Sequence, residues 1–213
     1  MTRLIFVRHG ESEANLQRAF AGWTDAALTD KGHAQAEAAA EYLLKYKIDV
    51  AYASDLQRAF GTAKHIADKQ GIPLIPDREL REIYAGDWEG RLFEDLIKED
   101  ADAYATWRQN IGLAHPTGGE SVVELQTRIH RAVKRILANH AGKTVLIGTH
   151  ATPIRVMECI WRDIPLVEAH TVPWRANASA TVVEYDEDAG VQIALCGYYE
   201  YLGDLLTGLP RTV

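Results

Sequence analysis

Short apolar runs alternate with amphipathic stretches along most of the chain. Three segments are short, mostly apolar and followed by polar residues, which is the pattern of buried strands: Leu4 to Val7, Val50 to Ser54 and Thr144 to Thr149. The stretches between and after them show helical spacing or helix-capping signals. They predict helices over residues 29–45, 55–70, 121–140 and 152–161.

Local signals set the ends of these helices. Thr29 can cap the first of them, and Gly71 with Pro73 can end the second. Ser121, followed three residues later by Glu124, resembles a capping box. Near the carboxyl end, two β-rich runs predict strands over residues 180–185 and 191–197, with a hairpin turn across residues 187–190.

Alternation of strands and helices predicts an α/β three-layer sandwich, with a mostly parallel central sheet flanked by helices. With 213 residues and no visible seam, we expect a single domain over residues 1–213. Residues 84–120 differ in character, being helix-favouring, aromatic and acidic, and they predict a helical, lid-like insertion. The aromatic residues there could equally be ordinary core residues.

Composition narrows the class of protein. The net charge is −7 and no run of Lys or Arg is present, which argues against a nucleic-acid or membrane partner. Cys159 and Cys196 form neither a disulfide framework nor a zinc pattern. We therefore expect a cytoplasmic protein without a bound metal or other cofactor. Oligomeric state is left open, a homodimer being one option.

Chemistry-bearing residues follow the predicted strands. Ligands of α/β sheets bind beyond the carboxyl ends of the strands. The segments that leave the three apolar runs carry Arg8 and His9, then Arg58, then His150. A neutral imidazole can attack phosphorus, and arginine offers a planar fork to phosphate oxygens. Each residue alone could be an ordinary solvated or hydrogen-bonded side chain, so their joint placement is the signal.

Several motifs resemble the histidine phosphatase superfamily, the phosphoglycerate-mutase-like group. They occur in the family's order over about residues 3–160. They are Arg8-His9-Gly10-Glu11-Ser12 with Asn15, residues 25–32, Ser54-Asp55-Leu56-Gln57-Arg58-Ala59, Leu80-Arg81-Glu82, residues 86–90, Gly118-Gly119-Glu120-Ser121 and Thr149-His150.

The resemblance implies a role for each matching residue. His9 would accept the phosphoryl group, and Glu82 would act as general acid and then as general base. Arg8, Arg58 and a protonated His150 would hold the phosphate oxygens in place of a metal ion. Asn15 and the backbone N–H of Ala151 would add neutral donors. The phosphate beside Glu82 should raise the pKa of its carboxyl group.

Two departures from the family pattern concern this site. Ala151 stands where the family usually has glycine or asparagine, although its backbone N–H is retained. Residues 20–23 look more like the mutase branch, whereas residues 86–90 look like the phosphatase branch.

Charge in the insertion favours a phosphatase over a mutase. We expect the substrate to be a small phosphorylated metabolite, although the sequence leaves the leaving group open. Residues 84–120 contain eight acidic and three basic residues, a net charge of −5, and would repel the bisphosphate that a mutase must hold. A cofactor-dependent phosphoglycerate mutase remains the main alternative. Two further alternatives are a non-catalytic module that binds a phosphorylated ligand and a metallohydrolase, although the chain has no HExxH motif.

Overall fold

The computed structural model describes residues 1–186 and 188–208, and its strands form a six-stranded sheet. The strand order is β3-β2-β4-β1-β5-β6. The pairs β1/β4, β2/β4 and β2/β3 are parallel, whereas β1/β5 and β5/β6 are antiparallel, so the expected mostly parallel sheet is confirmed. The strands are β1 (Thr2–Arg8), β2 (Val50–Ala53), β3 (Leu74–Pro76), β4 (Thr144–Thr149), β5 (Ala180–Asp186) and β6 (Gly190–Tyr198).

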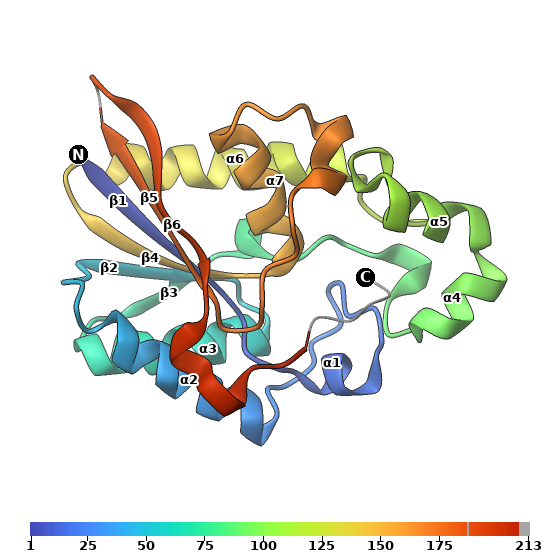
Figure 1. Ribbon diagram of the computed structural model, residues 1–213, viewed down its shortest axis with the longest axis horizontal. Coiled ribbons are helices and arrows are strands. Elements are labelled where there is room, and N and C mark those ends of the chain that lie inside the picture. Colours follow the sequence, from blue (N-terminus) through green and yellow to red (C-terminus); the bar gives the residue numbers. More distant parts are fainter. Residues whose placement is uncertain (187, 209–213) are drawn as a thin grey trace.

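Helices cover both faces of this sheet, as the prediction of a three-layer sandwich requires (Figure 1). Alternate residues of β1 point to opposite faces. Ile5 and Val7 belong to the apolar cluster beneath α2 (Asp30–Leu43) and α3 (Gln57–Gln70). Leu4 and Phe6 belong to the cluster beneath α6 (Val122–Asn139) and α7 (Ala151–Trp161). The core is therefore split by the sheet into two apolar layers.

The capping signals in the sequence operate as predicted. The Thr29 hydroxyl accepts a hydrogen bond from the Gly32 N–H at the start of α2. Ser121 and Glu124 form a reciprocal capping box at the start of α6. Among the elements that were not predicted are α1 (Glu13–Gln17) and β3, because five and three residues are too short to show a period.

Residues 84–120 are built mainly from short helices that lie to one side of the sheet (Figure 1). Trp88, Tyr104 and Trp107 are buried in the same apolar cluster as α6 and α7, whereas Tyr84 is exposed. Most of these aromatic residues are thus core residues. The elements are the 3₁₀ helices Gly86–Trp88 and Ile111–Leu113 and the helices α4 (Phe93–Glu99) and α5 (Ala101–Gln109).

The remaining elements complete the chain. Three further 3₁₀ helices span Arg78–Leu80, Leu166–Thr171 and Glu200–Leu205. The last two predicted strands are present and pair antiparallel as β5 and β6, but the turn predicted between them includes Glu187, which lies outside the described residues. Within the described part of the chain, every helix is too short or too polar to cross a lipid bilayer.

Candidate active site

Strand register brings the two candidate histidines together. In the parallel pair β1/β4, Arg8 lies opposite Thr149, so His9 and His150 are the next residues of adjacent strands. The His9 N–H donates to the Thr149 carbonyl over 3.0 Å. The two imidazole rings lie edge to face, with centroids 5.2 Å apart. Both residues therefore lie at the carboxyl edge of the sheet, where the sequence placed them.

A pocket at this edge contains nearly all the residues that were predicted for the site. Its lining residues include Arg8, His9, Asn15, Arg58, Glu82 and Ala151. His150 is fully buried and contacts this group through the His9 ring. These seven residues, His150 included, come from five separate segments of the sequence. The packing of strands and helices brings the segments into one cluster.

His9 is held in a defined tautomer. Its Nδ1 lies 2.7 Å from the carbonyl oxygen of Gly10. A carbonyl oxygen can only accept a hydrogen bond, so Nδ1 carries the proton and Nε2 keeps its lone pair. Burial, followed by the charges of Arg58 and Arg8, lowers the pKa of His9 well below its usual value. His9 is thus neutral at neutral pH and has a nucleophilic nitrogen.

The residue after His9 must be glycine, because another segment of the chain approaches position 10 closely. A Cβ atom at position 10 would lie 2.5 Å from the carbonyl oxygen of Gly32, at the start of α2. The Gly10 N–H donates to the Thr62 hydroxyl of α3 over 2.9 Å. These contacts fix the backbone that orients His9 against both α2 and α3.

The two arginines reach the pocket from different elements. Arg8 ends β1, and its Nη1 donates to the carbonyl of Arg175. Arg58 lies in the first turn of α3, and its two Nη atoms donate to the carbonyls of Gly22 and Thr24. The carboxylate of Asp25 accepts from the Gln57 N–H and so caps the helix that carries Arg58.

Both guanidinium groups have an Nε–H donor without a hydrogen-bond partner among the described residues. Burial lowers the pKa of Arg8 to about 10, with Glu82 opposing and Arg58 supporting the shift. Burial also lowers the pKa of Arg58, and both remain cations at neutral pH. The Nε atoms of Arg8 and Arg58 and Nδ1 of His150 are buried without a hydrogen-bond partner among the described residues. Buried donors of this kind are suited to an anionic ligand.

One electrostatic expectation was wrong. We expected a protonated His150, but burial, then the charges of Arg58 and His9, lower its pKa well below the usual value. Its Nε2 lies 2.8 Å from the Ser54 hydroxyl, which can donate to or accept from a neutral ring. The two arginines therefore supply the positive charge of this pocket, and His150 can act as a neutral donor.

Glu82 lies in the same pocket, with its carboxyl group held by two backbone donors. Oε1 accepts from its neighbour Ile83 over 2.8 Å, and Oε2 accepts from the Thr152 N–H in the first turn of α7 over 3.3 Å. Burial raises the pKa of Glu82, opposed by these hydrogen bonds and by Arg58. The pKa of Glu82 is raised, as predicted, but the cause in the ligand-free protein is burial of the carboxyl group and not a neighbouring phosphate.

Asn177, a residue that we did not predict, connects Asn15 to the backbone of His9. Asn177 Nδ2 donates to the His9 carbonyl over 3.1 Å and to Asn15 Oδ1 over 3.2 Å. Oδ1 of Asn15 also accepts from the Ser12 N–H, so its amide nitrogen is the end that can serve a ligand. Asn177 lies in the turn before β5, as the Asn177-Ala178-Ser179 sequence predicts, but no motif of phosphate chemistry marked it.

One wall of the pocket is aromatic, and two of its four aromatic residues come from the segment 84–120, which the sequence predicted to be aromatic and lid-like. Phe20 and Trp107 lie edge to face, with centroids 4.9 Å apart, and Trp107 stacks on Trp174 at 6.2 Å. Phe93 completes this group, and all four line the pocket. Among the described residues that line the pocket, the only arginine or lysine side chains are those of Arg8 and Arg58. Arg81, next to Glu82 in sequence, is paired bidentately with Asp55 over 2.6 Å.

Comparisons with known proteins agree with this geometry. The model of the histidine phosphatase superfamily (branch 1) matches residues 4–196. Phosphoserine phosphatase 1 of Hydrogenobacter thermophilus is 30% identical over 195 residues, covering 92% of each chain. The 2,3-bisphosphoglycerate-dependent phosphoglycerate mutase of Brucella anthropi is 37% identical over 167 residues, covering 72% of this chain and 78% of the mutase. The solved structure of YhfR from Bacillus stearothermophilus superposes with a TM-score of 0.90 at 32% identity, covering 95% of this chain and all of YhfR.

Proposed function

Because the chain belongs to the histidine phosphatase superfamily, we propose that it hydrolyses a small phosphomonoester through a phosphohistidine formed on His9. The observation that carries this proposal is the tautomer of His9. The Gly10 carbonyl holds the Nδ1 proton, so the Nε2 lone pair is available beside two buried arginines. A neutral imidazole in that state is a competent nucleophile toward phosphorus.

The first step transfers the phosphoryl group to the enzyme. His9 Nε2 attacks phosphorus while the bond between phosphorus and the ester oxygen breaks. Glu82 gives its proton to that leaving oxygen, so the alcohol departs neutral. The raised pKa of Glu82 favours the protonated form that this step needs.

The second step regenerates the enzyme. Water attacks phosphorus, the bond between nitrogen and phosphorus breaks, and the Glu82 carboxylate accepts the proton from water. Arg8 and Arg58 stabilise the charge on the phosphoryl oxygens in both steps. His150, Asn15 and the Ala151 N–H contribute neutral donors, the last in the first turn of α7, where N–H groups lack an intrahelical acceptor. The proposal requires neither a metal ion nor another cofactor.

The composition of the pocket supports a phosphatase over a mutase. A mutase must bind a second phosphate, which requires cations away from the first. Here the aromatic wall consists of Phe20, Phe93, Trp107 and Trp174, and Arg81 is already paired with Asp55. Such a wall suits an uncharged, largely apolar leaving group. We therefore place the substrate among small monoesters of that kind.

Trapping the intermediate tests the covalent step. The protein is mixed with phenyl phosphate carrying labelled phosphorus and quenched in alkaline detergent, because the nitrogen–phosphorus bond of phosphohistidine hydrolyses in acid. Label should remain on the wild-type chain and be absent from His9→Ala. His170→Ala, which removes an exposed imidazole elsewhere, is the matched control and should label normally. Label on His9→Ala, or phosphate release by that variant at the wild-type rate, would overturn the proposal.

A second assay distinguishes the two branches. The protein is given 3-phosphoglycerate with the bisphosphate primer, and both the 2-isomer and inorganic phosphate are quantified. A phosphatase releases phosphate from phenyl phosphate faster than it isomerises phosphoglycerate. The reverse order would establish a mutase. Full activity in EDTA is expected, and its loss with recovery on adding a divalent cation would indicate a metallohydrolase.

A further inference from the structure

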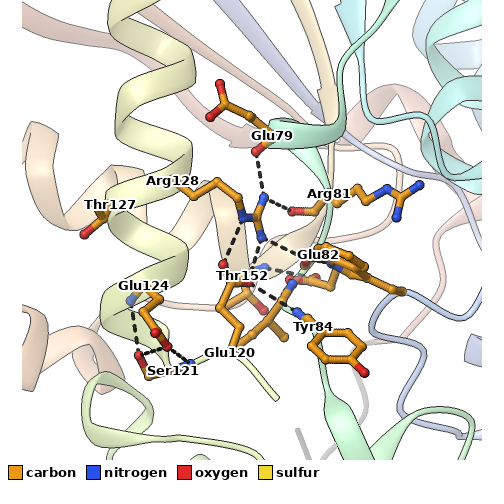
Figure 2. A network of polar contacts seen from close by, with 12 residues as sticks. Glu79, Arg81, Glu82, Tyr84, Glu120, Ser121, Glu124, Thr127, Arg128 and Thr152 are labelled. Carbon is orange, nitrogen blue, oxygen red and sulfur yellow. Dashed lines mark hydrogen bonds and ion pairs between the residues drawn. The ribbon is translucent and has the colours of Figure 1, made fainter. Parts of the chain in front are cut away.

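The Arg128 guanidinium group donates both to the loop that carries Glu82 and to the carboxylate of Glu120 (Figure 2). Nη1 donates to the carbonyls of Glu79 and Arg81 over 2.7 and 3.1 Å. Nη2 donates to the carbonyl of Glu82 over 3.1 Å and to a carboxylate oxygen of Glu120 over 2.8 Å. Nε donates to the other oxygen of Glu120 over 2.9 Å. All five N–H donors of arginine are therefore used.

Glu120 holds the same loop from the other side of Glu82. Its N–H donates to the Tyr84 carbonyl over 2.8 Å, and its Oε2 accepts from the Tyr84 N–H over 3.3 Å. Gly119 allows this approach, because a Cβ atom there would lie 2.4 Å from the Tyr84 carbonyl oxygen. The segment from residue 79 to residue 84 is thus bracketed by the Arg128–Glu120 pair.

The position of this bracket is set by the start of α6. The Ser121 capping box fixes the first turn of the helix, and Arg128 lies two turns further along. Each partner of the pair has only 14% of its side chain exposed, and the contact is bidentate. An ion pair of this kind is better ordered than one at the surface.

Arg128 donates to the backbone carbonyl of Glu82, whereas the Glu82 carboxyl group accepts from the N–H groups of Ile83 and Thr152. The Glu82 carbonyl accepts from Arg128 and also from the Trp23 indole N–H over 2.7 Å. With the carbonyl fixed, the side chain leaves the backbone in one direction, toward Ile83 N–H and Thr152 N–H. General acid catalysis requires the donor within hydrogen-bond reach of the leaving oxygen, and an error of 1 Å can cost about 100-fold.

We propose that Arg128 and Glu120 are positioning residues that hold the Glu82 carboxyl group where it can protonate the leaving oxygen. This inference rests on the proposed function, in which Glu82 is the acid. It assigns a role to the Gly119-Glu120 motif and to a residue of α6 for which the motifs gave none. Neither residue lines the pocket.

The inference predicts a dependence on the leaving group. p-Nitrophenolate is stable without a proton, whereas phenolate is far more basic and needs the acid. Loss of acid positioning should therefore slow phenyl phosphate much more than p-nitrophenyl phosphate. The constant to compare is kcat/KM, since it reports the steps up to departure of the alcohol and excludes hydrolysis of the phosphoenzyme.

The variants are Arg128→Met and Arg128→Lys, with Glu82→Gln as the reference for complete loss of the acid. Lysine keeps the charge but cannot bridge two carbonyls and a carboxylate together. Arg135→Met is the matched control, because Arg135 lies on the same helix and pairs with Asp77 and Glu79 without contacting Glu82. A ratio of two substrates on one preparation is unaffected by a misfolded fraction, and Arg128→Lys serves if Arg128→Met does not fold.

In both Arg128 variants, kcat/KM for phenyl phosphate should fall at least about 10-fold more than for p-nitrophenyl phosphate. Arg135→Met should keep the wild-type ratio. Equal losses on the two substrates would overturn the positioning role while leaving the phosphatase proposal intact. An unchanged ratio in Glu82→Gln would overturn both the acid assignment and this inference. If wild-type protein hydrolyses neither ester, the proposed function itself fails.

Discussion

The imidazole rings of His9 and His150 lie edge to face with their centroids 5.2 Å apart, one residue beyond a register pair of parallel strands. Both rings are buried beside Arg8 and Arg58, and the pKa of each is lowered well below the usual value. Two imidazolium ions could not share this site with two guanidinium ions. The charge of the pocket thus resides on arginine, and the histidines remain neutral for attack and hydrogen bonding.

Neutral buried histidines make stability depend on pH. Below the unfolded-state pKa of about 6.5, the unfolded chain binds protons that the folded chain does not, so stability falls as pH falls. The full contribution is present above that pH. Each such histidine adds a slope of up to about 1.4 kcal/mol per pH unit.

Between pH 6.5 and pH 5 we therefore expect the free energy of unfolding to fall less steeply in His150→Gln than in the wild type. The difference in slope should be up to about 1.4 kcal/mol per pH unit. Urea unfolding of both proteins at a series of pH values measures it. Parallel curves for wild type and His150→Gln would show that His150 is protonated in the folded protein.

The raised pKa of Glu82 predicts the alkaline limb of the activity profile. The acid form is required for the first step, so kcat/KM for phenyl phosphate should fall as pH rises through that pKa. Ionisation of the substrate also changes with pH, but it cancels in the ratio of wild type to Glu82→Gln. This ratio should be largest at acidic pH and decline as pH rises through the raised pKa of Glu82. A ratio that is constant from pH 5 to pH 9 would remove Glu82 from the role of acid.

Much of this site was predictable because each strand–loop junction is encoded locally. The apolar runs before Arg8 and His150 predict strands, and parallel strands end at one edge. The neighbourhood of His9 and His150 then follows from strand order. The neutral state of His150 did not follow, because it depends on burial and on charges contributed by separate elements.

The residues that were missed act through tertiary contacts and have no local pattern. Asn177 and Trp174 lie between α7 and β5, where neither spacing nor a catalytic motif indicates a role in the site. Arg128 is one of several basic residues on α6, and its five donors gain meaning only when the loop at Glu82 packs against that helix. Short elements such as α1 lack the length to show a period.

Replacing Gly10 should impair catalysis more than folding. In Gly10→Ala, the new Cβ atom would lie 2.5 Å from the Gly32 carbonyl oxygen, so the His9–Gly10 backbone must move. We expect a loss of at least about 100-fold in kcat, with a stability cost of about 1–3 kcal/mol. Gly61→Ala on α3 is the control, since its nearest neighbour is the flexible Leu28 side chain at 3.2 Å. Equal kcat values for the two variants would contradict the orientation argument.

Glu158 should be important for stability although it lies outside the pocket. Glu158 is 1% exposed and pairs with Arg162 and Arg175. The backbone carbonyl of Arg175 accepts a hydrogen bond from Arg8. Glu158→Leu leaves cations without a counterion, so we expect a loss of about 3–5 kcal/mol. The KM for phosphate esters should also rise as the Arg175 backbone loosens. The exposed Glu37, paired with Lys69, is the comparison, and Glu37→Leu should cost under about 1 kcal/mol by urea unfolding.

The aromatic wall predicts which part of the substrate Trp174 recognises. Trp174 lines the pocket, stacks on Trp107 and lies under the Arg155 guanidinium at 4.2 Å from the ring centroid. An aromatic pair contributes about 0.5–1.5 kcal/mol beyond area burial, which is about 2- to 12-fold in kcat/KM. Trp174→Leu should lower kcat/KM for 1-naphthyl phosphate by that factor while changing that for methyl phosphate little.

Trp161 offers a matched control for this variant. It is partly buried against Phe6, donates its indole N–H to the Tyr185 hydroxyl and does not line the pocket. Trp161→Leu should reduce stability yet keep the ratio of kcat/KM between the naphthyl and methyl esters. If Trp174→Leu also keeps the wild-type ratio, the leaving group does not contact this wall, and the preference for an apolar alcohol must be abandoned while the chemistry at His9 stands.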